Sequence, residues 1–392
     1  MRWRSDTVKL PGVEAPVRHP TASPQGALPL AGICAASSAD RVRIFTATHD
    51  GAIRGVDLET QEVFFSAQLD FELPSRERQL AEHFGVRDAA TLVASSDGRF
   101  LAVVQRFGLQ GALFDVQTQK LLKPLVRDDY HAEVSAWCIA IVDDVLVYAS
   151  AWNRIEAWSI SRLERIAPTD AETTLNYFWG HASVSPSGRY LASFGWHWHP
   201  IGVVRLIDLH AWLREGGEPK PEPIDVAADW WDDELCWIDE DTLVLAGDER
   251  DDESYFDKQT GLAFISRSDS KMVRFIKDLV PRALGVHGAR LVALGKETQV
   301  VDHDATLLHE THFWHPGARV ALTFHAHGSE LVMHRLLGVD ARGDLPAQPT
   351  RENLLVLADA LEARGASADA IAHCRAGEAH ASRCWVLDAC AE

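Results

Sequence analysis

The chain has 392 residues and a formal net charge of −19, with 57 Asp and Glu residues against 38 Lys and Arg residues. This acidic balance, without a Lys- or Arg-rich run, disfavours a wide nucleic-acid footprint or an anionic membrane patch and favours a basic partner. No apolar run reaches the roughly 18 residues of a spanning helix, and the first residues do not resemble a signal peptide, so we expect a cytoplasmic protein.

Residues 1–30 form an N-terminal arm in our interpretation. Residues 6–10 have the character of a strand, which we expect to complete the last repeat of the chain. The stretch that follows carries Pro11, Pro16, Pro20, Pro24 and Pro29. Proline lacks a backbone donor and fixes φ, so this stretch favours an extended connection.

Residues 31–348 contain a repeat in which a short apolar strand, a polar turn and a second apolar strand follow one another seven times, most clearly over residues 180–193. The turns lie at 38–40, 96–98, 143–144, 186–188, 239–241, 287–288 and 327–328. The second strands are predicted at 42–47, 100–104, 145–148, 190–194, 243–246, 291–294 and 330–333. A spacing of about 40–60 residues is typical of propeller blades. We therefore predict an all-β fold: a β-propeller of four-stranded antiparallel blades, seven-bladed, with six blades as the alternative.

Third strands of this repeat end in an apolar residue followed by Asp, at Asp57, Asp115, Asp208 and Asp302. With Thr48–Asp57 in the first unit and Gly180-His181 in the fourth, the chain resembles the WD40 family. In that family a Gly-His pair, an Asp in the turn between the second and third strands, and a terminal Trp-Asp form a structural hydrogen-bond network. The resemblance implies structural roles for His181, Asp50, Asp57, Asp115, Asp208 and Asp302. The terminal Trp is replaced, for example by Val56 and Phe114.

Residues 349–392 change to helical spacing, with Leu354, Leu357 and Leu361 on one stripe and Gly365 at its end. We expect a small C-terminal helical appendix. Residues 357–365 are similar to short helical modules that accompany repeat proteins of myxobacteria and planctomycetes.

Loops that enter a first strand and loops between second and third strands open on one face of a propeller, and the longer insertions of this chain fall there. Since loops carry function more often than the scaffold does, this face is the expected binding surface. Its candidate partner-binding residues are Trp196, His197, Trp198, His199, His312, Trp314, His315, Trp230, Asp251, Asp252 and Glu253. Exposed Trp and His suit recognition, and an acidic patch suits a cation or a basic peptide.

Other interpretations of these residues stay open. The Trp-His-Pro rings could pack beneath their own loops, and the acidic loop could serve only solubility. Closely spaced histidines could bind a metal, but no CxxC pair or HExxH motif accompanies them, so we expect no metal and no cofactor.

The leading hypothesis is a non-enzymatic protein-interaction module or regulatory scaffold, because GxSxG, P-loop and GxGxxG motifs are missing from the sequence. One alternative is a propeller hydrolase or lyase with an active site at the tunnel mouth. Another is a regulatory or autoinhibitory component of a bacterial conflict or defence system that acts through the C-terminal helices.

Overall fold

The computed structural model describes residues 2–9, 31–38, 41–58, 60–74, 89–166, 175–198, 201–228, 235–249 and 259–277, together with strands between residues 283 and 337. The predicted appendix at 349–392 lies outside the described residues. Two compact units are present. The large unit comprises Leu10–Pro281 and Ala326–Ser329; the small unit comprises Met1–Lys9, Arg282–His325 and Glu330–Glu392.

The large unit begins with three four-stranded antiparallel sheets. The first contains β2 (Gly32–Ser38), β3 (Arg41–Ala47), β4 (Ala52–Asp57) and β5 (Val63–Gln68). The second contains β6 (Ala90–Ala94), β7 (Phe100–Gln105), β8 (Gln110–Asp115) and β9 (Lys120–Val126). The third contains β10 (Ile139–Val142), β11 (Val145–Ala151), β12 (Arg154–Ser159) and β13 (Glu164–Arg165).

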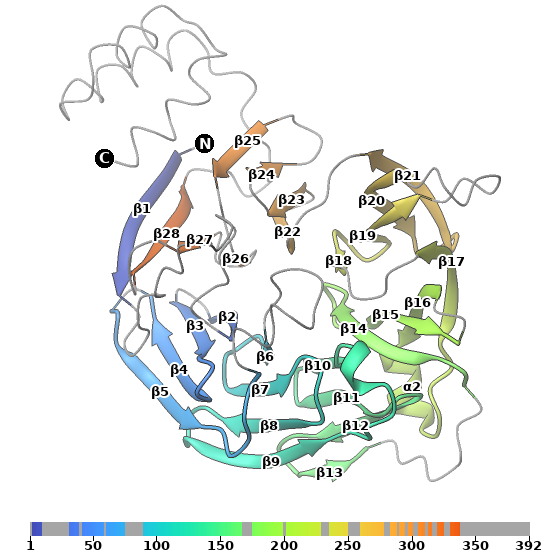
Figure 1. The fold of residues 1–392 in the computed structure, drawn as a ribbon, viewed down its shortest axis with the longest axis horizontal. Coiled ribbons are helices and arrows are strands. Elements are labelled where there is room, and N and C mark those ends of the chain that lie inside the picture. Colours follow the sequence, from blue (N-terminus) through green and yellow to red (C-terminus); the bar gives the residue numbers. More distant parts are fainter. Residues whose placement is uncertain are drawn as a thin grey trace, which may run out of the picture. The chain divides into compact units, whose positions relative to one another are not determined.

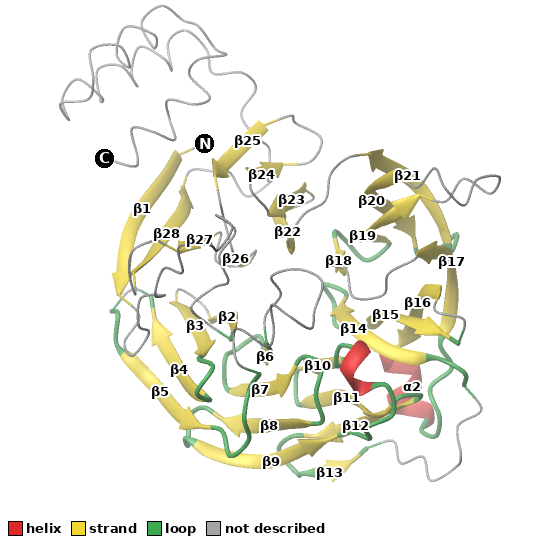
Figure 2. Ribbon diagram, viewed as in Figure 1, coloured by secondary structure: helices red, strands yellow, loops and turns green. Residues whose placement is uncertain are grey.

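The remaining strands of this unit form an eight-stranded sheet, which consists of two antiparallel sets joined by one parallel bridge between Asp225 and Lys271. One set contains β14 (Phe178–Val184), β15 (Tyr190–His197), β16 (Ile201–Asp208) and β17 (Glu222–Ala228). The other contains β18 (Leu235–Trp237), β19 (Thr242–Glu249), β20 (Gln259–Ser266) and β21 (Lys271–Lys277). Strands dominate the described chain (Figure 2), with the helical segments η1 (Ala132–Val134) and α2 (Leu209–Glu215).

The first strands of successive sheets are neighbours: β2 lies beside β6, β6 beside β10, β10 beside β14, and β14 beside β18. Each sheet then runs outward in chain order to its fourth strand (Figure 1). This arrangement of four-stranded antiparallel blades is a β-propeller, as the sequence predicts. Among the described residues, no helix has the length and apolar character needed to cross a membrane.

Both faces of a second strand such as β7 are buried against the neighbouring blades, which explains why this strand is a continuous apolar run. Along β7, Leu101 and Val103 pack in the core shared with the first sheet. Ala102 and Val104 point the other way and pack in the core shared with the third sheet. Because successive side chains of a strand alternate between faces, a strand buried on both sides must be apolar at every position.

The Asp residues that end third strands organise the turns into fourth strands. The backbone N–H of Thr60 donates to Asp57 at 3.1 Å, and that of Thr118 donates to Asp115 at 2.9 Å. Gln61 and Gln119 then adopt positive φ values of 59° and 55°. An Asp side chain that accepts from the backbone ahead of it stabilises such a turn.

Asp208 has the same position but begins α2 instead of a tight turn. Its carboxylate accepts from the backbone N–H of Ala211 at 2.9 Å and from Arg189 Nη2 at 2.8 Å. The Trp212 side chain of this helix is buried in the core of the fourth sheet. The helix therefore packs back onto its own sheet.

The small unit contains two four-stranded antiparallel sheets. One contains β22 (Ala283–His287), β23 (Arg290–Leu294), β24 (Glu297–Val300) and β25 (Ala305–His309). The other contains β26 (Phe313–His315), β27 (Val320–Phe324), β28 (Glu330–Leu337) and β1 (Arg2–Lys9). The N-terminal segment pairs with β28 over its whole length, from Arg2 opposite Leu337 to Lys9 opposite Glu330.

The strand order predicted for the seventh repeat is wrong by one strand. The turn at 327–328 was expected between first and second strands, but it joins β27 to β28, the second and third strands. The short β26 is the first strand. A strand of three residues is too short to show an alternation of apolar and polar residues, so the sequence does not distinguish it from a loop.

Deletion of Arg2–Lys9 should destabilise the small unit. The deletion removes the only partner that β28 has on that side in the described chain and exposes its backbone donors and acceptors. We expect hydrogen exchange of β28 amides to accelerate about tenfold or more, with little change in β7. Unchanged protection of β28 would contradict the pairing.

Stability should fall in acid partly through Asp208. Desolvation alone would raise the pKa of this carboxyl, but hydrogen bonds from Arg189 and Ala211 hold the pKa below its ordinary value of 3.8. Its contribution is therefore present above that ordinary value and is lost as the pH falls through the lowered folded value. At neutral pH, Asp208→Ala should cost about 1–2 kcal/mol in the free energy of unfolding, and this difference should shrink in acid. Denaturant titrations at several pH values measure this difference in the free energy of unfolding. Asp70→Ala, which removes an exposed carboxyl, is the control.

Candidate binding surface

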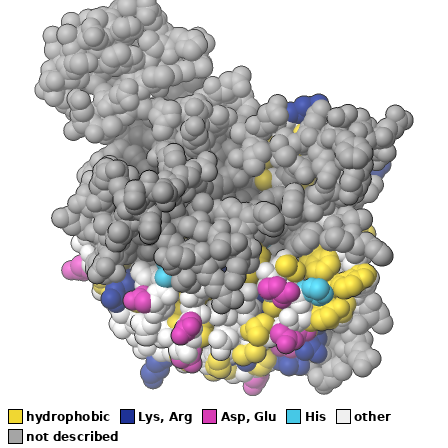
Figure 3. Space-filling view, in the orientation of Figure 1, with side chains coloured by type: hydrophobic (Ala, Val, Ile, Leu, Met, Phe, Trp, Pro, Cys, Tyr) yellow, Lys and Arg dark blue, Asp and Glu magenta, His cyan; other side chains and the backbone are white. Residues whose placement is uncertain are grey.

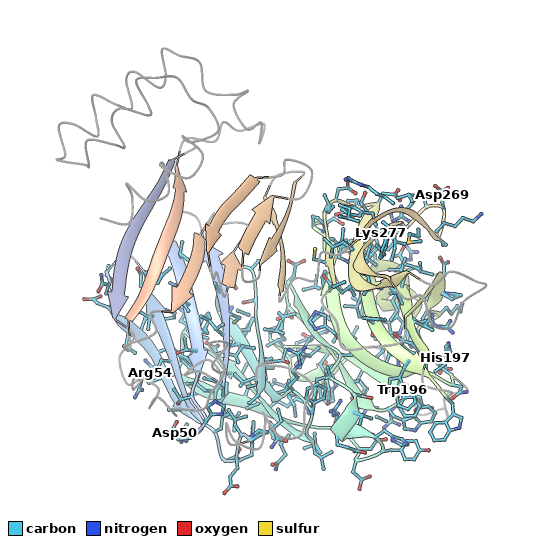
Figure 4. All side chains as sticks on the ribbon, turned by 45° about the horizontal axis from the view of Figure 1, so that its top comes forward. Asp50, Arg54, Trp196, His197, Asp269 and Lys277 are labelled. Atoms are coloured by element: carbon cyan, nitrogen blue, oxygen red, sulfur yellow. The ribbon has the colours of Figure 1, made fainter. Side chains whose placement is uncertain are left out.

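Six ring side chains from three segments of the large unit form a cluster at the end of the sheets where fourth-to-first and second-to-third loops meet, each in contact with at least one other ring of the cluster. The segments are the 126–134 loop between β9 and β10, the turn between β11 and β12, and the strands β14 and β15 with the turn after β15. We call this cluster the aromatic surface; it consists of Tyr130, His131, Trp152, Phe178, Trp196 and Trp198. Figure 4 shows Trp196 and His197 among ring side chains at this end of the unit.

Phe178 and Trp196 form the buried base of the aromatic surface. They are register partners on β14 and β15, and their rings stack with centroids 3.7 Å apart at an angle of 7°. Trp196 Nε1 donates to Ser135 Oγ at 2.9 Å, which satisfies the indole N–H in its buried place. A directly opposed cross-strand pair of large rings fixes both side chains, so the base is rigid.

Tyr130 and Trp198 lie on this base and are exposed to solvent, with 48% and 47% of their surface accessible. The Trp198 ring lies 6.1 Å from that of Phe178 and 5.5 Å from that of His131. The Tyr130 ring lies 4.6 Å from that of His131. Large aromatic side chains that remain half exposed together are characteristic of interaction sites. On the face drawn in Figure 3, exposed hydrophobic side chains gather near histidine and acidic side chains.

Arg127 anchors the loop that carries Tyr130 and His131. Its guanidinium is buried and donates to three backbone carbonyls, those of Gly108 at 2.7 Å, Ala132 at 2.9 Å and Ser135 at 2.8 Å. It also lies 5.0 Å from the centre of the Trp137 ring. Desolvation lowers the pKa of Arg127 to about 9, opposed by Asp128 and Glu133, so the side chain stays charged at neutral pH.

Three acidic residues flank Tyr130 and His131 in the sequence of the same loop. Asp128 accepts from the backbone N–H of Trp152 at 3.1 Å and so ties the loop to the neighbouring turn; desolvation raises the pKa of this carboxyl. Asp129 and Glu133 are exposed. Within the described part of the chain, neither makes an ion pair.

His197 is half buried, and both of its ring nitrogens are engaged. Nδ1 contacts the carbonyl of Asn176, so it must be the protonated nitrogen. Nε2 then accepts from Arg205 Nη2 at 3.0 Å. His197 therefore connects β15 to β16 and to the segment before β14.

The structure separates the predicted partner-binding residues. Trp198 is exposed on the aromatic surface, whereas Trp196 is buried beneath it and His197 is engaged internally. The predicted loop is also shorter than expected, because Trp196 and His197 still pair in β15. Trp314 and His315 belong to strand β26 and not to a loop, and their side chains are not described. The other candidates lie outside the described residues: His199, His312, Trp230, Asp251, Asp252 and Glu253.

Of the residues given structural roles by resemblance, Asp57 and Asp115 cap turns and Asp208 caps the start of α2, as described above. Asp50 accepts from Thr48 Oγ1 and from the backbone N–H of Ala52, which lowers the pKa of its carboxyl. His181 lies in β14 opposite Phe194. Asp302 lies outside the described residues.

Tyr130, His131, Trp152 and Phe178 were not identified from the sequence, although the longer loops of this face were expected to form the binding surface. These residues could have been found as aromatic residues in the loops and strand ends that open on this face. No group of three His, Cys, Asp or Glu side chains among the described residues could hold a metal ion.

Neither a protein-family model nor a curated protein matches the sequence. Among solved structures, the chain is similar to Kuenenia stuttgartiensis hydrazine synthase, at 14% identity over 71% of this chain and 69% of that chain, with a TM-score of 0.40. It is also similar to U3-55K, at 11% identity over 78% of this chain and 98% of that chain, with a TM-score of 0.47. Likenesses of this size carry no functional argument, so the fold assignment depends on the sheets themselves.

Replacement of Arg127 by Met should loosen the loop that carries Tyr130. Three buried carbonyl oxygens lose their donor, which should cost about 2–4 kcal/mol in the free energy of unfolding. Amides of residues 128–134 should exchange faster in Arg127→Met than in the wild type, whereas amides of β7 should change little. Arg162→Met, which removes an exposed arginine, should change stability by less than about 0.5 kcal/mol. Equal stability of the two variants would refute the anchoring role.

Proposed function

We propose that this chain is a non-enzymatic protein-interaction module whose partner binds the aromatic surface. One observation carries the proposal: Tyr130 and Trp198 are half exposed, and the ring of each lies against Phe178 of the buried, stacked base. A soluble domain without a partner gains nothing from keeping two large rings half exposed on one surface.

The energetics of such a contact favour tight recognition. Covering the remaining exposed surface of one such ring would contribute roughly 2 kcal/mol at about 25 cal/mol per Å². The rings are already held by His131, Phe178 and Trp196, so little side-chain entropy is lost on binding. Rigid aromatic anchors at the centre of an interface are the usual hot spots of protein association.

We also propose that the repeats belong to the WD40 family and that the protein is a cytoplasmic regulatory scaffold in a bacterium. The turn-capping Asp57 and Asp115 support the family assignment, and the abundance of Arg and Ala in the sequence supports the bacterial origin. A basic protein partner is the counterpart expected for a chain with a net charge of −19.

Affinity capture from a lysate of the native host tests the proposal. Tyr130→Ala and Trp198→Ala should each reduce the recovered partner about tenfold or more, because each removes an anchor ring. Leu121→Ala is the matched control, since Leu121 is 49% exposed but lies on the outer strand β9. All three variants should keep the wild-type circular dichroism spectrum. Partner recovery that is unchanged by Tyr130→Ala and Trp198→Ala would overturn the proposed function.

A further inference from the structure

The loop that presents Tyr130 also presents two exposed carboxylates, neither of which makes an ion pair with another described residue. Asp129 and Glu133 stand on either side of Tyr130 and His131 in the sequence and are exposed. The cation of the loop, Arg127, points inward, where its donors are taken by backbone carbonyls. The outer side of the loop thus combines exposed rings with exposed negative charge.

We infer that the aromatic surface recognises an arginine side chain in an exposed segment of the partner protein, with the guanidinium stacked on the Tyr130 or Trp198 ring and paired with Asp129 or Glu133. The inference rests on the proposed function and adds the chemistry of the partner. Charge complementarity selects a cation as the occupant, and the rings select a cation that is flat and weakly hydrated.

Arginine fits this combination better than lysine does. Its guanidinium is planar, stacks on aromatic faces and can still donate in its own plane to a carboxylate, whereas an ammonium is a compact and strongly hydrated charge. The same packing occurs within this protein. The guanidinium of Arg267 lies 4.4 Å from the Tyr190 ring centre while it pairs with Asp241 at 3.5 Å.

Fluorescence anisotropy with a labelled Gly-Ser-Arg-Gly-Arg-Ser-Gly peptide tests the inference on the full chain. Matched peptides carry lysine, or the uncharged arginine analogue citrulline, at the two arginine positions. We expect the arginine peptide to bind at least about fivefold more tightly than the lysine peptide, and the citrulline peptide to bind more weakly than both.

Charge-removal variants show whether the arginine peptide binds at this site or is attracted only by the net negative charge of the chain. Asp129→Asn with Glu133→Gln should weaken binding of the arginine peptide about tenfold, and so should Trp198→Ala. Glu62→Gln with Glu218→Gln removes two exposed charges elsewhere and should change binding less than twofold. These exposed substitutions should leave thermal unfolding within a few degrees of the wild type.

Three results would overturn the inference: no binding of the arginine peptide, equal binding of the arginine and lysine peptides, or equal weakening by the two double variants. Each would leave the proposed function standing if Tyr130→Ala and Trp198→Ala still abolish partner capture. Unchanged capture in those variants would instead remove the proposed function itself.

Discussion

Burial of both faces of the inner strands of a blade, seen most clearly in the β6–β9 sheet, is the constraint on which the rest of the large unit depends. The strands β7 and β8 have no water-facing side, since their alternate residues enter the cores shared with the first and third sheets. Such a sheet is stable only between two others. The choice of side chain is then freest at the ends of the strands, where side chains leave the core and reach solvent.

The aromatic surface shows how this constraint creates a site. Trp152, Phe178 and Trp198 come from separate strand ends, and neighbouring blades bring them within ring contact. The 126–134 loop adds Tyr130 and the carboxylates, and it is held by a charged group that faces the interior. Rigid blades position the base, and one anchored loop supplies the exposed ring and the charges, so the site is built on a fixed scaffold.

The scaffold was more predictable from the sequence than the surface was. Second strands such as β7 and β15 are continuous apolar runs because both faces are buried, and turn-capping residues such as Asp57 and Asp115 mark where third strands end. The failures have physical causes. A three-residue strand such as β26 resembles a loop, and a surface made from distant strand ends leaves no local pattern. Trp198 was identified because a Trp in a turn is conspicuous, whereas Phe178 at the start of an apolar strand is not.

The pairing of β1 with β28 has a consequence for how the protein is made. The two strands lie near opposite ends of the sequence, so during synthesis β1 emerges first and must wait until β28 has left the ribosome. Contacts of such long sequence separation form late and slow folding. Until then β1 and the unfinished sheet both carry unpaired backbone edges, which are sites for pairing with another chain. Before β1 pairs with β28, the exposed strand edges can therefore pair with other chains, and the nascent protein is open to aggregation.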